Sequence, residues 1–362
     1  MLFNSMAYAA FLPIVFIVYW AIPHRFRWPV LLAASCYFYM SWNAKYIVLI
    51  LFTTLVSYTA ARLLGRCGSK RQKQWVLFGA AALCLGVLVI FKYAGFLLGN
   101  FYAALSAFGI HPHPVTVSLM LPVGISFYTF QTLSYVIDVY RGEIPAEKHF
   151  GIYATFVSFF PQLVAGPIER TANLLPQLRK EHFFDADKAL CGAKRMLWGF
   201  FKKLVIADNL APFVDMVYAD VTSYYGVDFA IVIVFFSVQI YCDFSGYSDI
   251  AVGTAKLLGI DLMTNFKSPY LSASIREFWS RWHISLSTWF RDYVYIPLGG
   301  NRCSGLRHKA NLLATFLLSG LWHGASWNFV AWGGLHGLAQ VMQASIPHRG
   351  GYPVAKALSC GG

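Results

Sequence analysis

Charged residues are scarce in this sequence. Only 12% of the 362 residues are Asp, Glu, Lys or Arg, which is about half of the ~25% usual in soluble globular proteins. Hydrophobic residues make up 57% and aromatic residues 17%, and so little charge does not cover a core of that size in water. These proportions exclude an ordinary soluble enzyme, a disordered chain and a nucleic-acid-binding module. They predict a protein that is dissolved in lipid.

Several familiar motifs are also missing from the sequence. It contains no Gly-x-Ser-x-Gly, Walker loop, Gly-x-Gly-x-x-Gly or His-Glu-x-x-His, so a serine hydrolase, an NTPase, a dinucleotide-binding fold and a zinc protease lack support. The seven cysteines include no Cys-x-x-Cys pair, and we predict neither a disulfide framework nor a metal site. The segment from Met6 to Ile22 lacks the basic start and cleavage site of a signal peptide, and we interpret it as the first membrane helix.

Long apolar runs are what the sequence does contain. A helix needs about 20 apolar residues to cross a membrane, and several of the runs are shorter or are interrupted by Gly and Pro. We therefore expect an all-α polytopic membrane protein with roughly ten transmembrane and re-entrant segments. The runs lie at residues 6–22, 28–42, 46–64, 75–98, 115–138, 151–165, 193–212, 228–242, 247–260 and 310–342.

The net charge of +13 is concentrated in short stretches between the apolar runs. Basic clusters at residues 62–73, 170–203 and 302–309 are typical of the cytoplasmic loops of a membrane protein. The loop 65–74 should therefore face the cytoplasm, and counting helices outward from it places the N-terminus and the loop 99–114 outside. The latter carries no Lys or Arg, in agreement with that orientation.

Two polar regions interrupt the apolar pattern. Residues 166–203 mix basic and aromatic side chains, which suits helices lying on the inner leaflet. Residues 265–309 are too charged to face lipid and should lie at the interface or inside the protein. Within them, Glu277 and Arg281 have the spacing of a favourable helical ion pair.

His323 is the most informative of the ten histidines. An apolar helix begins near Ala310, and thirteen residues place His323 about 20 Å along it, inside the hydrocarbon core. An ionisable group at that depth is a functional hypothesis by default; the alternative is a neutral histidine bonded to a backbone carbonyl. His336 lies about 220° further round the same helix and should face away, unless Gly333 and Gly334 break the helix, so we interpret it as structural.

A second histidine, His283, ends the polar region. Two tryptophans and three hydroxyl groups surround it between Trp279 and Ser287. That composition suits the mouth of a buried cavity and equally suits an aromatic belt at the membrane surface.

Two further clusters deserve consideration as parts of a site. Asp243 and Asp249 bracket a polar stretch between two apolar runs, where they are expected either to orient a histidine or, more commonly, to cap the next helix. The stretch from Phe160 to Arg170, which includes Gln162, reads as a helix broken at membrane depth. Such a break is tolerated only inside protein or beside a cavity.

Taken together, these clusters resemble the membrane-bound O-acyltransferase family. The similarity involves residues 159–170, 243–249, 276–291 and the run Leu321-Trp322-His323-Gly324-Ala325-Ser326-Trp327. It is closest to the bacterial branch of alginate O-acetyltransferases and D-alanyl transfer proteins, which the opening residues 1–5 and 11–13 also resemble.

The resemblance implies a fold and a set of roles. The fold is a single membrane domain over residues 1–362, in which a ring of helices surrounds a central tunnel: N-terminal helices 1–140, a motif-bearing core 141–342 and a tail 343–362. Relatives usually continue with further helices, so a shortened C-terminus is expected. His323 matches the essential histidine of the family and His283 a second functional one, both at the neck of the tunnel. The predicted tunnel or donor-binding residues are Trp279, Arg281, Trp282, Ser285, Ser287, Arg291, Trp322, Asp243, Ser245, Tyr247 and Gln162.

The implied activity is transfer of an acetyl group from a cytoplasmic thioester across the bacterial inner membrane. The donor is acetyl-CoA or an acyl-thioester carrier, with no bound cofactor. The acceptor is an extracytoplasmic polysaccharide such as alginate or peptidoglycan, reached directly or through an extracytoplasmic acetyltransferase partner, and no nucleic acid is involved. Two alternatives stay open: D-alanyl transfer to teichoic acid from a carrier protein, and a transporter or flippase without chemistry.

Overall fold

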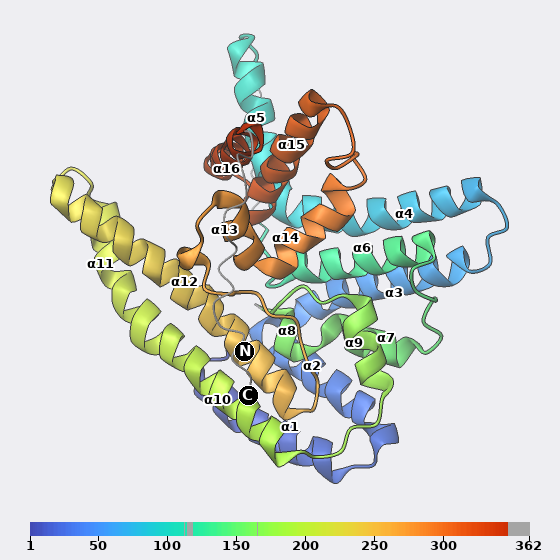
Figure 1. The fold of residues 1–362 in the computed structure, drawn as a ribbon. Coiled ribbons are helices and arrows are strands. Elements are labelled where there is room, and N and C mark those ends of the chain that lie inside the picture. Colours follow the sequence, from blue (N-terminus) through green and yellow to red (C-terminus); the bar gives the residue numbers. More distant parts are fainter. Residues whose placement is uncertain (112, 114–118, 165, 347–362) are drawn as a thin grey trace. The chain divides into compact units, whose positions relative to one another are not determined.

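The computed structural model describes residues 1–111, 113, 119–164 and 166–346, and over these residues the chain is helical, with no β-strand (Figure 1). Two compact units account for the described chain. Unit 1 comprises Met1–Lys267 together with Trp282–Leu286, and unit 2 comprises Ser268–Arg281 together with residues 287–346. Most of the predicted tail, residues 347–362, lies outside the described residues.

Unit 1 contains the helices that are long and apolar enough to cross a membrane. In the described part of the chain there are three such helical runs, His24–Leu64, Lys70–Ala107 and Gly226–Leu257, and the shorter apolar helix Met6–Ala21 precedes them. This confirms the all-α membrane class. The ring of roughly ten segments stays a prediction. The predicted loop at 99–114 is wrong up to Ala107, because these residues belong to a helix, Ala94–Ala107.

The α-helices of unit 1 range from 4 to 32 residues in length, and several are joined by 3₁₀ or π turns. They are α1 (Met6–Ala21), η1 (His24–Phe26), α2 (Arg27–Asn43), η2 (Ala44–Tyr46), α3 (Ile47–Leu64), α4 (Lys70–Leu88), η3 (Val89–Tyr93), α5 (Ala94–Ala107), α6 (Ile125–Arg141), α7 (Phe150–Ser158), α8 (Phe160–Leu163), α9 (Thr171–Arg179), α10 (Ala186–Phe200), η4 (Phe201–Ala207), α11 (Asp208–Ala219) and α12 (Gly226–Leu257). The helix break predicted near Phe160 is present, because α7 ends at Ser158 and α8 ends at Leu163.

Helices α10 and α12 of unit 1 pack against each other and run side by side in Figure 1. Glycines make this approach possible. A Cβ atom on Gly199 would lie 2.6 Å from the Gly246 carbonyl oxygen, and one on Gly192 would lie 2.8 Å from that of Gly253. Each helix carries its two glycines seven residues apart, about two helical turns, so both contacts lie on one face.

Helix α12 corrects one prediction. The apolar runs 228–242 and 247–260 were expected to be separate helices with Asp243 and Asp249 at the junction, yet α12 continues from Gly226 to Leu257 without interruption. Neither carboxylate therefore caps a helix. The polar stretch is tolerated inside a helix because it faces basic side chains of α10 and η4, which the apolar pattern along one helix does not reveal.

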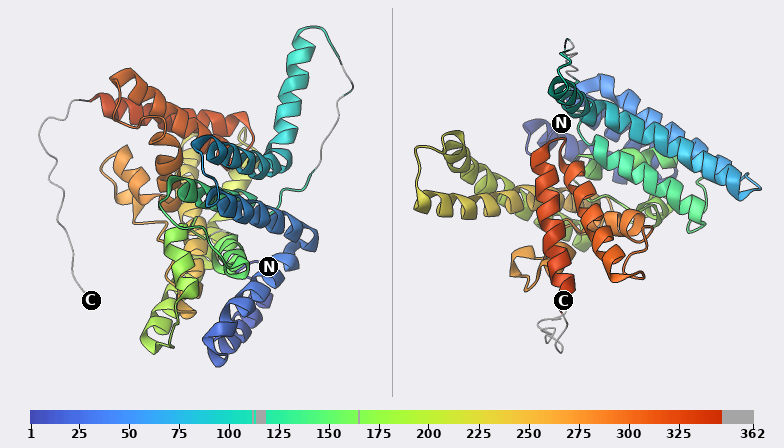
Figure 2. Two further views of the ribbon diagram at one scale, coloured as in Figure 1. Left: turned by 90° about the vertical axis from the view of Figure 1, so that its right-hand side faces the viewer. Right: turned by 90° about the horizontal axis from the view of Figure 1, so that it is seen from above.

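Unit 2 consists of a short polar part and an antiparallel helix pair. Its elements are η5 (Pro269–Leu271), α13 (Ile275–Arg281), the end of α14 (Ile284–Phe290), η6 (Arg291–Tyr295), α15 (Gly305–His323) and α16 (Trp327–Ser345). Helices α15 and α16, both orange to red in Figure 2, cross where Gly320 meets Gly333, since a Cβ on Gly320 would lie 3.1 Å from the Gly333 Cα. Two facing glycines thus allow the backbones of α15 and α16 to approach closely.

This pair corrects a second prediction. His323 and His336 were expected on one helix, with a possible break at Gly333 and Gly334, but α15 ends at His323 and the chain reverses before Trp327. Both glycines lie inside α16, where Gly333 contacts α15. The glycines serve helix packing, and the apolar run 310–342 is two helices. Helix α15 also begins at Gly305, earlier than the predicted start near Ala310.

Candidate functional site

His283 lies at the entrance to α14 in a strained backbone conformation. Its φ is 42°, one of two positive values at non-glycine residues in the described chain, and such strain is concentrated at functional sites. The side chain is only 2% exposed. Its ring meets the ring of Phe244 edge-on, at 4.6 Å between centroids, and that of Phe266 at 6.5 Å. His283 is therefore held in an aromatic enclosure of unit 1.

The neighbouring Trp282 belongs to the same enclosure. Its ring lies 5.2 Å from Phe266, nearly perpendicular, and 6.2 Å from Tyr241. The prediction left open whether this tryptophan lines a cavity or a membrane-surface belt. In unit 1 it packs inside the protein, with 9% of its surface exposed.

Asn265 and Ser285 fix the start of α14. The Asn265 carbonyl accepts from the Ile284 N–H at 2.9 Å, and its side-chain Oδ1 accepts from the Ser285 N–H at 3.2 Å and from the Ser285 hydroxyl at 2.6 Å. The same hydroxyl oxygen accepts from the Ile168 N–H at 3.0 Å. Ser285, a predicted site residue, thus joins the broken-helix stretch, the segment before unit 2 and the helix behind His283.

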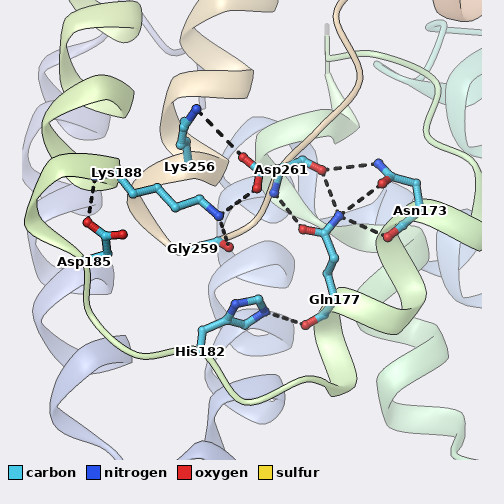
Figure 3. Close-up of polar contacts among 8 residues, drawn as sticks. All are labelled: Asn173, Gln177, His182, Asp185, Lys188, Lys256, Gly259 and Asp261. Carbon is cyan, nitrogen blue, oxygen red and sulfur yellow. Dashed lines mark hydrogen bonds and ion pairs between the residues drawn. The ribbon is translucent and has the colours of Figure 1, made fainter. Parts of the chain in front are cut away.

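The segment that carries Asn265 is anchored along its length. Figure 3 shows its start, where the Asp261 carbonyl accepts from Gln177 at 2.9 Å and from Asn173 at 3.2 Å. Lys188 forms an ion pair with the Asp261 carboxylate at 2.7 Å. Two residues further on, the Met263 N–H donates to Glu169. Helices α9 and α10, together with Glu169 before α9, therefore hold this segment.

Glu169 is a fully buried carboxyl beside this segment. It lies outside the apolar helices that are long enough to span a membrane. Burial raises the pKa of Glu169 to about 7, although hydrogen bonds from Asn173 and from the Met263 and Arg170 backbone, and the Arg170 charge, act in the opposite direction. The carboxyl is thus poised near neutral pH.

Gln162 faces the protein interior from α8. Its Nε2 donates to the Phe156 carbonyl at 2.8 Å, and among the described residues its buried Oε1 has no hydrogen-bond partner. Gln131 of α6 donates to the same carbonyl at 3.0 Å. The two glutamines therefore secure the end of α7 at the helix break, as expected of broken backbone enclosed in protein.

The Asp243–Asp249 stretch forms an ion-pair network with α10 and η4. Asp249 accepts from Arg195 at 2.9 Å and from Lys202 at 2.5 Å. Lys202 also donates to Ser245 at 3.0 Å, and Asp243 pairs with Lys203. The prediction that these carboxylates orient a histidine is therefore wrong: both are engaged by cations, and the network belongs to helix packing.

Tyr247 lies at the edge of the same network. Its hydroxyl reaches the side chain of Asn4 at 3.5 Å, and the Lys203 ammonium lies 5.2 Å from its ring. Of the predicted donor-binding residues, Asp243, Ser245 and Tyr247 thus lie together on α12.

His323 ends α15 among aromatic rings in unit 2. The Trp332 ring lies 5.1 Å from it, the Trp322 ring 5.1 Å, and Phe329 stacks at 6.3 Å. The histidine is half-buried. Trp332 also contacts His336 at 4.6 Å, so one indole touches both histidine rings. The expectation that His336 is turned away assumed a single helix, and the reversal of the chain after His323 removes that assumption.

Trp279 completes the aromatic cluster of unit 2. Its ring lies 5.1 Å from His336 and 5.7 Å from Trp332. Its buried Nε1–H has no hydrogen-bond partner among the residues that the structure describes. Three predicted residues, Trp279, Trp322 and His323, are therefore brought into one cluster.

The predicted anion-binding arginines both have carboxylate partners. Arg281 pairs with Glu277 at 2.5 Å, which confirms the predicted helical ion pair, and Arg291 pairs with Asp292 at 2.7 Å. Ser287 lies on α14 between them. In the described chain, groups of three or more His, Cys, Asp or Glu side chains able to hold a metal ion do not occur.

Three residues of these clusters are absent from the sequence predictions: Asn265, Glu169 and Trp332. Asn265 and Trp332 lie in ordinary polar and apolar contexts. Glu169 stands inside a quoted motif, between the end of α8 and the start of α9, and the signal that marks it is a lone carboxylate beside apolar residues. Their importance follows from contacts with segments far away in the sequence.

Comparison with known proteins shows which family this chain resembles. The family model of MBOAT, the membrane-bound O-acyltransferase family, matches residues 146–349, a range that includes His283 and His323. A probable alginate O-acetylase AlgI of Azotobacter vinelandii is 43% identical over 93% of this chain and 67% of its own length. The counterpart in Pseudomonas aeruginosa is 42% identical over 96% of this chain and 66% of its own length.

More distant similarities extend to other acyl transfer proteins. A peptidoglycan O-acetyltransferase of Helicobacter pylori is 36% identical over 96% of the chain and 71% of its own length. A teichoic acid D-alanyltransferase of Streptococcus thermophilus is 28% identical over 76% of the chain and 66% of its own length. The chain spans about two thirds of the length of these relatives.

Proposed function

This chain belongs to the membrane-bound O-acyltransferase family, and from that premise we propose that it is a membrane O-acetyltransferase. It takes an acetyl group from a cytoplasmic thioester, acetyl-CoA or an acyl carrier, and delivers it for O-acetylation of an extracytoplasmic polysaccharide of the alginate or peptidoglycan kind. The observation that carries the proposal is similarity over 93% and 96% of the chain to proteins named as alginate O-acetylase and peptidoglycan O-acetyltransferase.

The reaction determines which groups are needed. A hydroxyl oxygen of the acceptor adds to the thioester carbonyl carbon while a base takes its proton, and the carbonyl electron pair moves onto oxygen. When that pair returns, the C–O bond is kept, the C–S bond breaks, and the departing thiolate takes up the proton. The enzyme therefore needs one group that exchanges a proton near neutral pH and donors that stabilise the oxyanion.

We assign proton transfer to His323. An imidazole has an ordinary pKa of about 6.5, which suits a base near pH 7. It stands at the C-terminal end of α15, where the chain reverses before α16. The rings of Trp322 and Trp332 hold the imidazole on two sides and limit its rotation.

His283 is the second histidine of the proposal. Its enclosure by Phe244 and Phe266 and its strained backbone support a role in orienting the thioester or bonding its carbonyl. Arg281 and Arg291 are proposed to attract the anionic part of the donor, together with the basic stretches. If an extracytoplasmic acetyltransferase partner accepts the acetyl group first, the transfer to that partner follows the same reaction steps.

Replacement of His323 tests the catalytic assignment. His323→Ala should abolish transfer of labelled acetyl groups from the thioester, by 10³-fold or on that order, while the amount of folded protein in the membrane stays the same. The measurement is acetyl ester formed per mole of purified protein. His308→Ala is the matched control, because His308 lies on the same helix near its other end, and it should retain activity. Undiminished acetylation by the His323 variant would remove the assignment.

A second acyl donor distinguishes acetyl transfer from the alternative within the family, D-alanyl transfer. Similarity to teichoic acid D-alanyltransferase covers 76% of the chain, so the same purified protein should be offered a D-alanyl thioester beside the acetyl thioester. Preference for the acetyl thioester supports the proposal. Preference for the D-alanyl thioester would mean that the chain transfers D-alanyl instead of acetyl, while its assignment as an acyltransferase stands. Turnover of neither thioester would indicate transport without chemistry.

A further inference from the structure

The segment 261–265 is held at alternate residues. Asp261 is fixed by α9 through Gln177 and Asn173 (Figure 3), Met263 by Glu169, and Asn265 by the first turn of α14. These contacts fix the backbone at Asp261 and Met263 and the side chain of Asn265. Asn265 is therefore held in place against α14, the helix that follows His283.

The orientation of the Asn265 carboxamide follows from its partners. The Ser285 backbone N–H is only a donor, so the side-chain atom 3.2 Å from it must be the oxygen Oδ1. The Ser285 hydroxyl oxygen accepts from the Ile168 N–H, so its own proton is directed at Oδ1, 2.6 Å away. Two donors thus occupy Oδ1, and Nδ2 points away from Ser285.

That Nδ2 group is buried without a partner. Asn265 is 1% exposed, and its Nδ2 atom has no hydrogen-bond partner in the described part of the chain. A buried unpaired donor costs about 1–3 kcal/mol, and native proteins retain few of them. Since two anchored contacts hold the amide in this orientation, the donor is positioned in advance for an oxygen atom that arrives from outside the chain.

The backbone of Asn265 lies beside His283. The Asn265 carbonyl bonds to Ile284, the next residue after the histidine, and Phe266, which follows Asn265, has its ring 6.5 Å from the His283 ring. Asn265 and His283 are thus neighbours within unit 1, joined through the backbone contact at Ile284.

We propose that the Asn265 Nδ2–H group donates a hydrogen bond to the carbonyl oxygen of the acyl group during transfer. The inference rests on the proposed acyltransferase function. As the acceptor hydroxyl adds to the carbonyl carbon and loses its proton to the base, the electron pair of the C=O bond becomes an oxyanion, which this fixed donor stabilises. When the C–S bond breaks, the pair returns to form the ester carbonyl and the thiolate takes the proton. A donor positioned in advance pays no reorganisation cost in that step.

The test compares two substitutions, one that removes the hydrogen-bond donor and one that removes a contact anchoring it. Asn265→Asp keeps the oxygen that Ser285 bonds and replaces only the donor, whereas Ser285→Ala keeps the donor and removes one anchor. Acetyl transfer from acetyl-CoA is measured with each purified full-length chain, with KM and kcat determined separately and thermal unfolding as the folding control. The proposal expects Asn265→Asp to lower kcat about 10²–10³-fold with KM for acetyl-CoA nearly unchanged, and Ser285→Ala to lower kcat less than tenfold.

Three outcomes decide the matter. If Asn265→Asp retains kcat, or if Ser285→Ala lowers kcat more than Asn265→Asp does, Asn265 is an anchor for α14. The inference is then overturned while the proposed function stands. If Asn265→Asp does not fold, Asn265→Ala is compared with its parent in the Ser285→Ala background; a further kcat loss of about 10²-fold supports the donor, and no further loss overturns it. If the unaltered chain transfers no acyl group, the proposed function fails and the inference falls with it.

Discussion

At the scale of single residues, the most unusual group outside the histidines is Glu169. Its carboxyl is enclosed where the broken helix meets the Asn265 segment, and its acceptors are used by Asn173 and the Met263 backbone. Burial disfavours the charged form, which is why the pKa rises to about 7 despite these donors and the nearby Arg170. A change in the charge of Glu169 therefore acts on the backbone that positions Asn265.

The raised pKa predicts a pH dependence of stability. Because the pKa is higher in the folded chain than in the unfolded chain, the contribution of Glu169 is fully present below pH 4.5 and is lost as pH rises through about 7. The loss amounts to about 3 kcal/mol at most. Thermal unfolding in detergent between pH 5 and pH 8 measures it.

Glu169→Gln is the control for this dependence, because an amide does not ionise in that range. The variant should unfold at a temperature that changes less between pH 5 and pH 8 than that of the unaltered chain. Equal pH dependence of the two proteins would show that Glu169 is already charged throughout.

At the scale of elements, facing glycines set the distances between helices in both units. In unit 1, Gly192 and Gly199 of α10 meet Gly253 and Gly246 of α12, and the Asp249 ion pairs lie beside this contact. In a membrane, small residues drive helix association because backbones then approach closely enough for strong van der Waals packing. The ion pairs are placed by that approach, since Lys202 and Arg195 both reach one carboxylate.

A methyl group at Gly199 should therefore loosen unit 1. Its Cβ would meet the Gly246 carbonyl oxygen at 2.6 Å and the Ile250 nitrogen at 2.8 Å, and overpacking of this kind costs about 1–3 kcal/mol. We expect Gly199→Ala to lower the unfolding temperature in detergent. Gly79→Ala in α4, where a Cβ meets nothing within 4 Å, should leave it unchanged or slightly higher. Equal effects at the two sites would count against close packing of α10 on α12.

At the scale of the whole molecule, charge distribution determines how the chain is oriented in a bilayer. The basic residues gather in stretches between apolar helices, including the connection between α3 and α4. Lys and Arg near helix ends remain on the cytoplasmic side. In the predicted orientation the basic stretch before α10 also lies on the cytoplasmic side, where we propose that an anionic acyl donor binds.

Cysteine labelling tests this orientation. Cys67 lies in the α3–α4 connection and is partly exposed. In a chain that keeps only this cysteine, a membrane-impermeant maleimide should label inside-out vesicles and leave intact spheroplasts unlabelled. Ser106→Cys, at an exposed position near the end of α5 in an otherwise cysteine-free chain, should show the reverse. Labelling of Cys67 from outside would invert the proposed topology.

Composition by itself determined that lipid is the solvent and that helices form the structure, because transfer free energies and the need to satisfy backbone groups depend on residue type and run length. The order of residues also indicated the break near Phe160 and the Glu277–Arg281 pair, because both depend on residues close together in the sequence. Only the tertiary structure decided that α12 is continuous, that α15 ends at His323, and that Asn265 holds α14. Each of these depends on a contact between distant segments: cations from η4 on Asp249, Gly333 against Gly320, and Ser285 against Asn265.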